Sequence, residues 1–262
     1  MPAAADAVVV GGGTVGAWCA YFLRQAGLDQ VILLEKRTLG QGASSRAAGI
    51  VRTQGGTTWA VQLGEWSRRF YLSQHERLGI DSGFTPQGYV LPDLDPSRLP
   101  MVFDLSAGLY WRPEEKGLLF GMSNPDERPG PAACVDEEYL ARMRERLAEL
   151  VPVTRGLGLR RVWAATIDYT PDHLPIIGPA VVNDEILNGL TVASAGGAGM
   201  MWGPAVARAA ADVALTGSSD VVDTAVLGLD RFDADGNSRL AADPIALPFP
   251  AHAPPPGTHA PP

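Results

Sequence analysis

A glycine-rich turn between an apolar run and a helix-forming segment is the feature that most constrains this fold. Gly11, Gly13 and Gly16 form the pattern G-x-G-x-x-G directly after the β-branched run at 7–10. The segment 15–25 that follows has the apolar spacing of a packed helix. Such glycines permit a tight turn, a close approach of the backbone to a diphosphate, and close contact between helix and strand.

A second apolar run, at 31–34, completes a βαβ unit and ends in an acid. Glu35 lies 19 residues beyond Gly16, the separation at which a carboxylate meets a ribose hydroxyl. Unpaired N–H groups at the start of the helix can bind the diphosphate. The pattern therefore predicts a Rossmann-like dinucleotide site. An acid at Glu35 disfavours the 2′-phosphate of NADP, and both FAD and NAD remain open.

The charge and cysteine content exclude several other classes of protein. The chain has 21 Lys and Arg against 29 Asp and Glu, a net charge of −8, which disfavours contacts with nucleic acid and with an anionic membrane. Cys19 and Cys134 cannot form a disulfide framework and show no zinc spacing with the four histidines. No apolar run is long enough to span a membrane, and no export signal is visible at the start. We expect a cytoplasmic protein that binds neither nucleic acid nor a membrane.

Weaker patterns organise the rest of the chain. Apolar residues at helical steps predict a helix over 58–78, with a core-packing stripe of Trp59, Leu63, Trp66 and Phe70. The remaining expected elements are a short strand at 89–91, a hairpin of 109–111 and 118–120, a helix capped by Asp136, a strand at 190–193, and a helix from about Pro204 to Leu215. After about residue 243 the chain is rich in Pro and Ala, which predicts a disordered tail.

The segment 36–52 carries a second pattern, G-x-G-A-S-S-R-A-A-G. With Glu35 before it, this stretch resembles the second fingerprint of the FAD-dependent amine and amino-acid oxidoreductases of the D-amino-acid oxidase superfamily, which include glycine oxidase and sarcosine oxidase. Three further segments, at 110–113, 168–179 and 196–205, are similar to family motifs and follow the family's order. Together the matches span most of residues 7–217.

The resemblance implies an α/β fold, α+β overall, with a Rossmann-like FAD-binding domain and a reduced antiparallel substrate sheet. It implies a first part of the FAD-binding domain at 1–90, a reduced substrate or cap domain at 91–165, the closing part of the FAD-binding domain at 166–220, and a C-terminal extension at 221–262.

The resemblance also implies a noncovalently bound FAD, because Ala165 stands where some relatives carry the cysteine that bonds to the flavin. In the family, the fingerprints and the closing loop surround this cofactor. The positions that correspond to cofactor-binding residues are Gly11, Gly13, Thr14, Val15, Gly16, Glu35, Lys36, Ser44, Ser45, Arg46, Gly49, Ile50, Gly197, Gly199, Met200 and Met201.

The family's reaction is the oxidation of a C–N bond in a small amine or amino acid, by hydride transfer to flavin N5. Arg52 falls where sarcosine oxidases place an arginine near the substrate carboxylate, and an arginine suits a carboxylate through two parallel hydrogen bonds. Ala198 and Met201 replace the His and Lys of sarcosine oxidases, and Ile167 replaces the Arg of glycine oxidases. The resemblance therefore names no particular substrate.

One departure concerns the length of the chain between the strand near Tyr89 and the hairpin near Tyr110. Family members hold there a strand of the FAD sheet and a V-x-A-A-G-x-W segment, whereas here only 92–100 connect the two. A missing strand leaves an exposed sheet edge, where an oligomeric partner could bind. Two alternatives stay open, a non-catalytic member that keeps the nucleotide-binding half and an NAD-dependent dehydrogenase.

Overall fold

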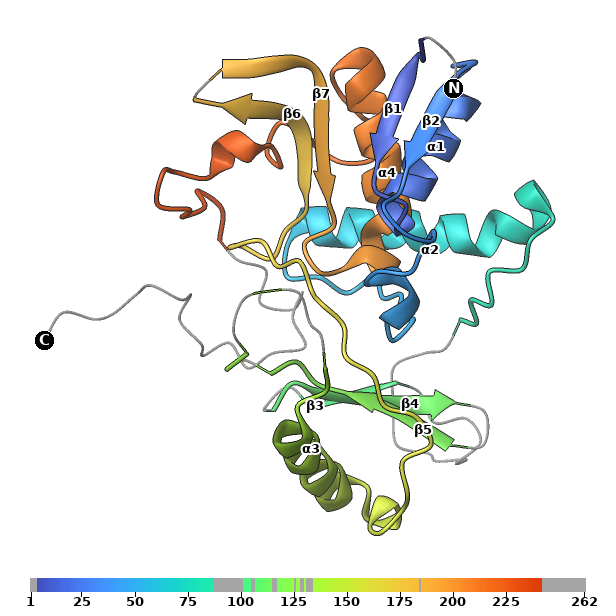
Figure 1. Ribbon diagram of the computed structural model, residues 1–262, viewed down its shortest axis with the longest axis vertical. Helices are drawn as coiled ribbons and strands as arrows, with labels where there is room; N and C mark the ends of the chain where they lie inside the picture. Colours follow the sequence, from blue (N-terminus) through green and yellow to red (C-terminus); the bar gives the residue numbers. More distant parts are fainter. Residues whose placement is uncertain are drawn as a thin grey trace, which may run out of the picture. The chain divides into compact units, whose positions relative to one another are not determined.

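The chain folds into two compact units in a computed structural model (Figure 1). Unit 1 comprises Met1–Phe84 with Ile167–Ala246, and unit 2 comprises Thr85–Thr166 with Leu247–Pro262. The structure describes residues 4–86, 101–104, 107–114, 117–124, 126–127, 130, 134–183 and 185–241. The strand expected at 89–91 and the tail after 243 lie outside these residues.

Unit 1 begins with the βαβ unit that the glycine pattern predicts. Strand β1 (Ala7–Val10), helix α1 (Thr14–Gln25) and strand β2 (Val31–Leu34) follow one another, and the strands pair in parallel from Ala7 opposite Val31 to Val10 opposite Leu34. Figure 1 shows α1 lying beside the strand pair. The prediction of a Rossmann-like α/β unit is confirmed.

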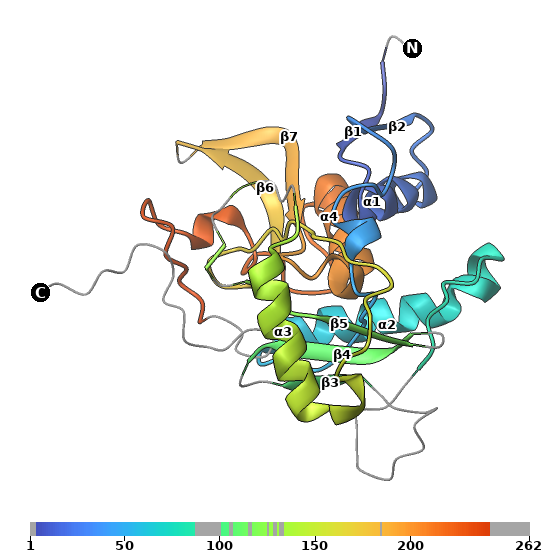
Figure 2. The same ribbon diagram turned by 60° about the horizontal axis from the view of Figure 1, so that its bottom comes forward.

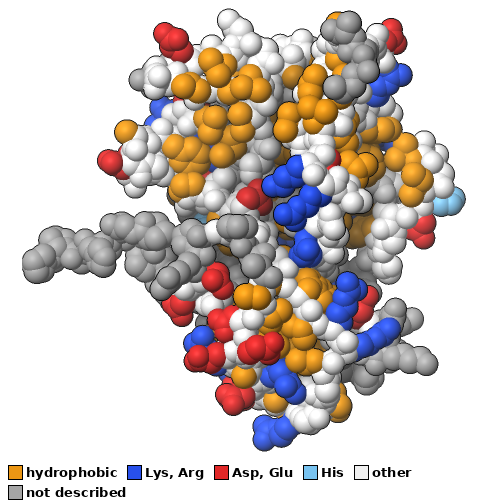
Figure 3. Space-filling model, in the orientation of Figure 1, with side chains coloured by type: hydrophobic (Ala, Val, Ile, Leu, Met, Phe, Trp, Pro, Cys, Tyr) orange, Lys and Arg blue, Asp and Glu red, His pale blue; other side chains and the backbone are white. Residues whose placement is uncertain are grey.

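The two faces of this strand pair differ in their burial. Ala7 and Val9 point toward a cluster formed by Phe22 and Leu23 of α1 and by Phe70. On the opposite face, the exposed aliphatic side chains are Val8 (55%), Val10 (82%) and Leu34 (46%). The apolar run 31–34 suggests a strand buried along its whole length, and this is wrong for Leu34, because within the described parts of the chain a helix covers one face of the strand pair only. Figure 3 shows hydrophobic side chains gathered over β1 and β2, and over β6 and β7 (bounds below).

Helix α2 (Thr58–Leu78) has the bounds that its apolar spacing predicts. Thr57 caps it by accepting a hydrogen bond from the amide of Ala60, and Gly79 ends it in the left-handed conformation at φ 67°. The predicted core stripe is confirmed: Leu63 and Phe70 are buried, and Trp59 and Trp66 pack against the same clusters.

Helix α4 (Gly199–Thr216) is the most buried helix among the described elements and packs against α1 and α2 (Figures 1 and 2). The sequence predicts its start at Pro204, which is wrong, because the helix begins five residues earlier. Pro204 lies inside it and has no N–H to donate to the Met200 carbonyl. The Tyr71 hydroxyl donates to that carbonyl instead, at 2.8 Å, so the helix can continue through the proline.

An antiparallel pair closes unit 1. Strands β6 (Ile176–Val182) and β7 (Glu185–Ser194) form a two-stranded sheet, and β7 contains the strand predicted at 190–193. After α4, a segment that includes the short helix η4 (Leu229–Arg231) returns to this sheet. Its residues Val221, Val222 and Leu227 are buried in the same cluster as α4, so the core of unit 1 extends past residue 220.

Among its described residues, unit 2 contains a small antiparallel sheet and a helix of 14 residues. Strands β3 (Val102–Asp104), β4 (Leu109–Glu114) and β5 (Gly117–Gly121) lie in that order, which confirms the predicted hairpin and the reduced antiparallel sheet. Helix α3 (Glu137–Leu150) starts at Asp136, whose carboxylate accepts a hydrogen bond from Tyr139 N at 2.9 Å as predicted, and is followed by the short helix η3 (Pro152–Thr154). Within the ranges given above, no helix combines the length and the apolar character that crossing a membrane requires.

Candidate dinucleotide site

The turn between β1 and α1 brings backbone segments too close for side chains. Gly11 has φ 109°, which L residues rarely adopt. A Cβ atom on Gly16 would lie 1.8 Å from the Gly11 carbonyl oxygen, and one on Gly203 of α4 would lie 2.6 Å from Thr14 Cγ2. The glycines thus let the turn close on itself and let α4 approach the first turn of α1.

Glu35 joins this turn to the loop after β2 through its two carboxylate oxygens. Oε2 accepts a hydrogen bond from Gly12 N at 2.7 Å, and Oε1 accepts one from Arg37 N at 2.9 Å. These two bonds, with Gly12 as the larger cause, lower the pKa of Glu35 below its ordinary value. The group therefore stays charged, and a carboxylate has further lone pairs that can accept hydrogen bonds from ribose hydroxyls.

Ser44 belongs to the short helix η1 (Ser44–Arg46) and reaches the start of α1. Its Oγ accepts a hydrogen bond from Thr14 N at 2.9 Å and lies 3.0 Å from Thr14 Oγ1. A Cβ atom on Gly13 would lie 3.2 Å from the same Oγ. Gly13 is the N-cap of α1 and has no side chain to cap it, so the Ser44 hydroxyl satisfies the first amide of the helix from 30 residues away.

Met200 connects this cluster to the closing glycine loop. Thr14 Oγ1 lies 3.4 Å from Met200 Sδ, so the first turn of α4 meets the first turn of α1. Gly199, Met200 and Met201 are the first three residues of α4, and their amides precede the first intrahelical bond, from Trp202 N to the Ala198 carbonyl at 2.8 Å. Two helix N-termini, each a site for negative charge, therefore lie side by side.

The other predicted cofactor-binding residues lie in the segments next to the contacts of Thr14 with Ser44 and Met200, or in the core. Ser45 Oγ and Arg46 Nη1 both donate to the Gly42 carbonyl, at 3.4 and 3.0 Å, and so shape the loop before η1. An open cavity lies against this loop, lined by Thr38, Leu39, Gly40, Gln41, Ser44 and Ser45. The Val15 side chain packs in the core, and Lys36 is exposed.

The chain after η1 leads toward α2. Gly49 adopts φ 71°, and Ile50 is half-buried. Arg52 Nη1 donates to the Gln54 carbonyl at 3.5 Å, and a Cβ atom on Gly64 of α2 would lie 2.7 Å from the Arg52 carbonyl oxygen. The backbone at Arg52 is therefore seated on α2.

The closing loop before α4 packs against the segment that precedes β6. Gly196 and Gly197 have φ 57° and 86°. A Cβ atom on Gly196 would lie 2.9 Å from the Leu174 carbonyl, and one on Gly197 would lie 2.8 Å from Ile167 Cγ2. Sequence similarity identifies both segments, and the structure brings them into contact.

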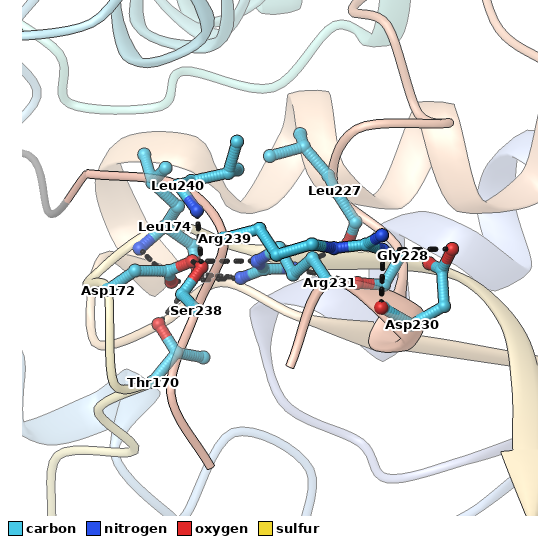
Figure 4. Close-up of polar contacts among 10 residues, drawn as sticks. All are labelled: Thr170, Asp172, Leu174, Leu227, Gly228, Asp230, Arg231, Ser238, Arg239 and Leu240. Carbon is cyan, nitrogen blue, oxygen red and sulfur yellow. Dashed lines mark hydrogen bonds and ion pairs between the residues drawn. The ribbon is translucent and has the colours of Figure 1, made fainter. Parts of the chain in front are cut away.

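A buried ion pair fixes that preceding segment, and the sequence analysis missed it (Figure 4). Arg231 of η4 donates to both carboxylate oxygens of Asp172, at 2.7 and 3.0 Å, and the side chains are 3% and 1% exposed. Ser238 Oγ donates to the same carboxylate at 2.6 Å. Burial alone would raise the pKa of Asp172, but the hydrogen bonds from Arg231 and Ser238 lower it below its ordinary value. One signal in the sequence was the place of Asp172 in the family-like segment 168–179, and nothing local pointed to Arg231 as its partner.

Comparison with known proteins decides the family. The model of the family of FAD dependent oxidoreductases, DAO, matches residues 6–101 and 90–213. The chain belongs to this family. FAD is the cofactor of the family, and the close backbone approaches at Gly13, Gly16 and Gly203, with two helix N-termini side by side, fit an anionic dinucleotide.

The curated relatives that this chain resembles are longer proteins. This chain is 40% identical over 84 residues to a 4-methylaminobutanoate oxidase (formaldehyde-forming) of Paenarthrobacter nicotinovorans. The aligned residues cover 32% of this chain and 10% of that protein. The chain is 34% identical over 155 residues to FAD-dependent oxidoreductase domain-containing protein 1 of Bos taurus. This alignment covers 56% of this chain and 29% of that protein. The matched parts thus span less than a third of these relatives.

Two solved structures share the fold of this chain. L-proline dehydrogenase from P. horikoshii aligns with a TM-score of 0.68 and 16% identity, covering 84% of this chain and 96% of that one. Glycine oxidase from Geobacillus kaustophilus aligns with a TM-score of 0.64 and 17% identity, covering 87% of this chain and 99% of that one.

Proposed function

We propose that this DAO-family chain is an FAD-dependent oxidoreductase that oxidises the C–N bond of a small amine or amino acid. The observation that carries the proposal is the contact of Thr14 with both Ser44 and Met200, at 2.9 and 3.4 Å. Through Thr14, the glycine turn at 11–16, the segment 40–49 and the closing loop before α4 meet at one site in unit 1. Relatives named as acting on 4-methylaminobutanoate and dimethylglycine support an amine substrate.

In this proposal each part of the site has a distinct task. The amides at the start of α1, with the Ser44 hydroxyl, bind the diphosphate, and Glu35 accepts hydrogen bonds from the ribose. The amides of Gly199, Met200 and Met201 would stabilise the negative charge that develops on the pyrimidine side of the flavin ring during reduction. When bound, FAD supplies the acceptor for the hydride that leaves the substrate carbon.

Substrate binding is assigned to Arg52. Its guanidinium stays charged at any physiological pH and can hold a carboxylate through two hydrogen bonds. Its backbone packs closely against Gly64 of α2, which fixes the position from which the side chain extends. A noncovalent cofactor follows from Ala165, which offers no thiol to the flavin.

A non-catalytic role is the second candidate. The short connection at 92–100 and the exposed face of Val8, Val10 and Leu34 favour it, because a complete flavin domain covers its parallel sheet on both faces. In that role the chain would keep the nucleotide-binding half without completing a substrate cavity. The NAD alternative is disfavoured by the family match.

The visible spectrum of the purified protein separates these functions. We expect flavin absorption bands, either as isolated or after incubation with FAD, and bleaching of these bands when a substrate amine is added without oxygen. A protein that takes up FAD but is not bleached by any amine in a panel would support the non-catalytic role. A protein that stays colourless with FAD but binds NADH would contradict the flavin assignment.

A further inference from the structure

Helix α4 lacks one backbone hydrogen bond, and a side chain of the neighbouring helix α2 replaces it. Pro204 is the sixth residue of α4 and cannot donate to the carbonyl of Met200, its usual partner four residues earlier. Tyr71 of α2 donates its hydroxyl to this carbonyl at 2.8 Å. Burial raises the pKa of Tyr71 strongly, so the hydroxyl keeps the proton that it donates.

A second side chain of α2 acts on the next residue of α4. The amide of Ala205 donates to Ser67 Oγ at 3.2 Å. Ser67 and Tyr71 are four residues apart and so lie on one face of α2. They are 0% and 8% exposed. Two buried hydroxyl groups therefore bond to α4 on either side of Pro204.

Met200 is consequently held at both of its ends. Tyr71 binds its carbonyl, and Thr14 contacts its sulfur at 3.4 Å. The carbonyl of Met200 and the amide of Met201 belong to the same peptide group. A hydrogen bond to the carbonyl polarises that group and makes its N–H a stronger donor. Tyr71 is thus placed to influence both the position of the first turn of α4 and the donor strength of the Met201 amide.

We propose that Tyr71, with Ser67 beside it, is a positioning residue for the flavin ring. It fixes the turn Gly199–Met201 against Thr14, and it strengthens the Met201 amide toward the oxygen or nitrogen of the ring on which negative charge develops during reduction. The inference rests on the proposed FAD-dependent function. Neither side chain has to touch the cofactor, because both act through the α4 backbone.

The test compares Tyr71→Phe with Tyr21→Phe as a matched control. Tyr21 lies on α1 within an aromatic cluster, and no hydrogen bond of its hydroxyl is found among the described residues. Three quantities are measured for each protein: the Kd for FAD, the midpoint potential of the bound flavin, and hydrogen–deuterium exchange of the amides within 202–206, where Pro204 has none.

For Tyr71→Phe we expect the Kd for FAD to rise roughly three- to tenfold, the range of one lost neutral hydrogen bond. We also expect a more negative flavin potential and faster exchange at 202–206. Ser67→Ala should change all three quantities in the same direction, and Tyr21→Phe should match the wild type. Thermal unfolding of each variant separates these local effects from a general loss of structure.

The outcomes distinguish the two proposals. If the wild type binds FAD while Tyr71→Phe keeps its affinity and potential, the positioning role is wrong and the flavin function stands. If the wild type binds no FAD under any condition, the proposed function fails and this inference fails with it. If exchange at 202–206 is unchanged in Tyr71→Phe, the bond to Met200 does not hold the turn, which also overturns the inference.

Discussion

Arg231 and Asp172 form a two-point ion pair that joins the C-terminal part of unit 1 to the segment before β6. The guanidinium also donates to the carbonyls of Leu227 and Leu174, at 2.7 and 3.1 Å, so its donors are used within the fold (Figure 4). The segment that it anchors carries Ile167 and Leu174, which lie against the closing loop at Gly196 and Gly197. The pair supports the site without belonging to it.

Asp172→Asn is expected to destabilise the protein by about 3–5 kcal/mol, because removing one partner of a buried pair leaves the other charge uncompensated. Asp230→Asn is the matched control. Asp230 pairs with Arg239 at 3.5 Å, and both side chains are more than 60% exposed, so its loss should cost less than about 1 kcal/mol. Urea unfolding followed by circular dichroism measures both values, and equal values would contradict the assignment.

The same pair predicts a dependence of stability on pH. The folded-state pKa of Asp172 lies below its ordinary value of 3.8, so its stabilisation is fully present above about pH 4 and is lost as the pH falls through the folded-state pKa. The difference in free energy of unfolding between wild type and Asp172→Asn should therefore be constant from pH 7 to pH 5 and shrink below pH 4. A difference that grew on acidification would have the wrong sign.

Gly16→Ala is expected to abolish FAD binding. The added methyl group would lie 1.8 Å from the Gly11 carbonyl oxygen, so the turn has to open and the amides at the start of α1 move away from the diphosphate. Flavin absorbance after desalting measures the bound cofactor. Gly158→Ala, where no atom lies within 4 Å of the added Cβ, should retain the cofactor and shows whether adding a methyl group by itself matters.

Arg52→Ala is expected to raise the KM for an amino-acid substrate roughly 10- to 100-fold, the effect of losing a charge-assisted hydrogen bond of about 1.5–3 kcal/mol. The flavin spectrum should be unchanged. Arg52→Lys should recover only part of the affinity, since lysine cannot form two parallel bonds to a carboxylate. A simple amine without a carboxylate provides the internal control, because its KM should not respond. An unchanged KM for the amino acid would show that Arg52 does not bind substrate.

Local patterns in the sequence predicted the elements that form from short-range interactions. The glycine turn with its flanking strand and helix, the stripe of α2 and the Asp136 cap of α3 all depend on residues within a few turns of one another. The start of α4 could not be predicted in this way. A proline ordinarily marks a first turn, and its tolerance here depends on Tyr71, which lies 129 residues from Met200 in sequence.

The site shows the same division. The spacing from Gly16 to Glu35 indicated a carboxylate near the turn, and Glu35 bonds to Gly12. The partnership of Asp172 with Arg231 spans 59 residues and joins a family motif to a segment that resembles no motif. Long-range pairs of this kind depend on the completed packing of the chain, and no local periodicity encodes them.

The hydrogen bond between Thr14 N and Ser44 Oγ has a kinetic consequence. It joins the two loops that we propose bind the diphosphate, at 11–14 and at 42–46, so the entropy of ordering these loops is lost when the chain folds and not when a nucleotide arrives. The rate of nucleotide binding should then depend mainly on how often protein and nucleotide meet in the right orientation, because little rearrangement of the protein is needed.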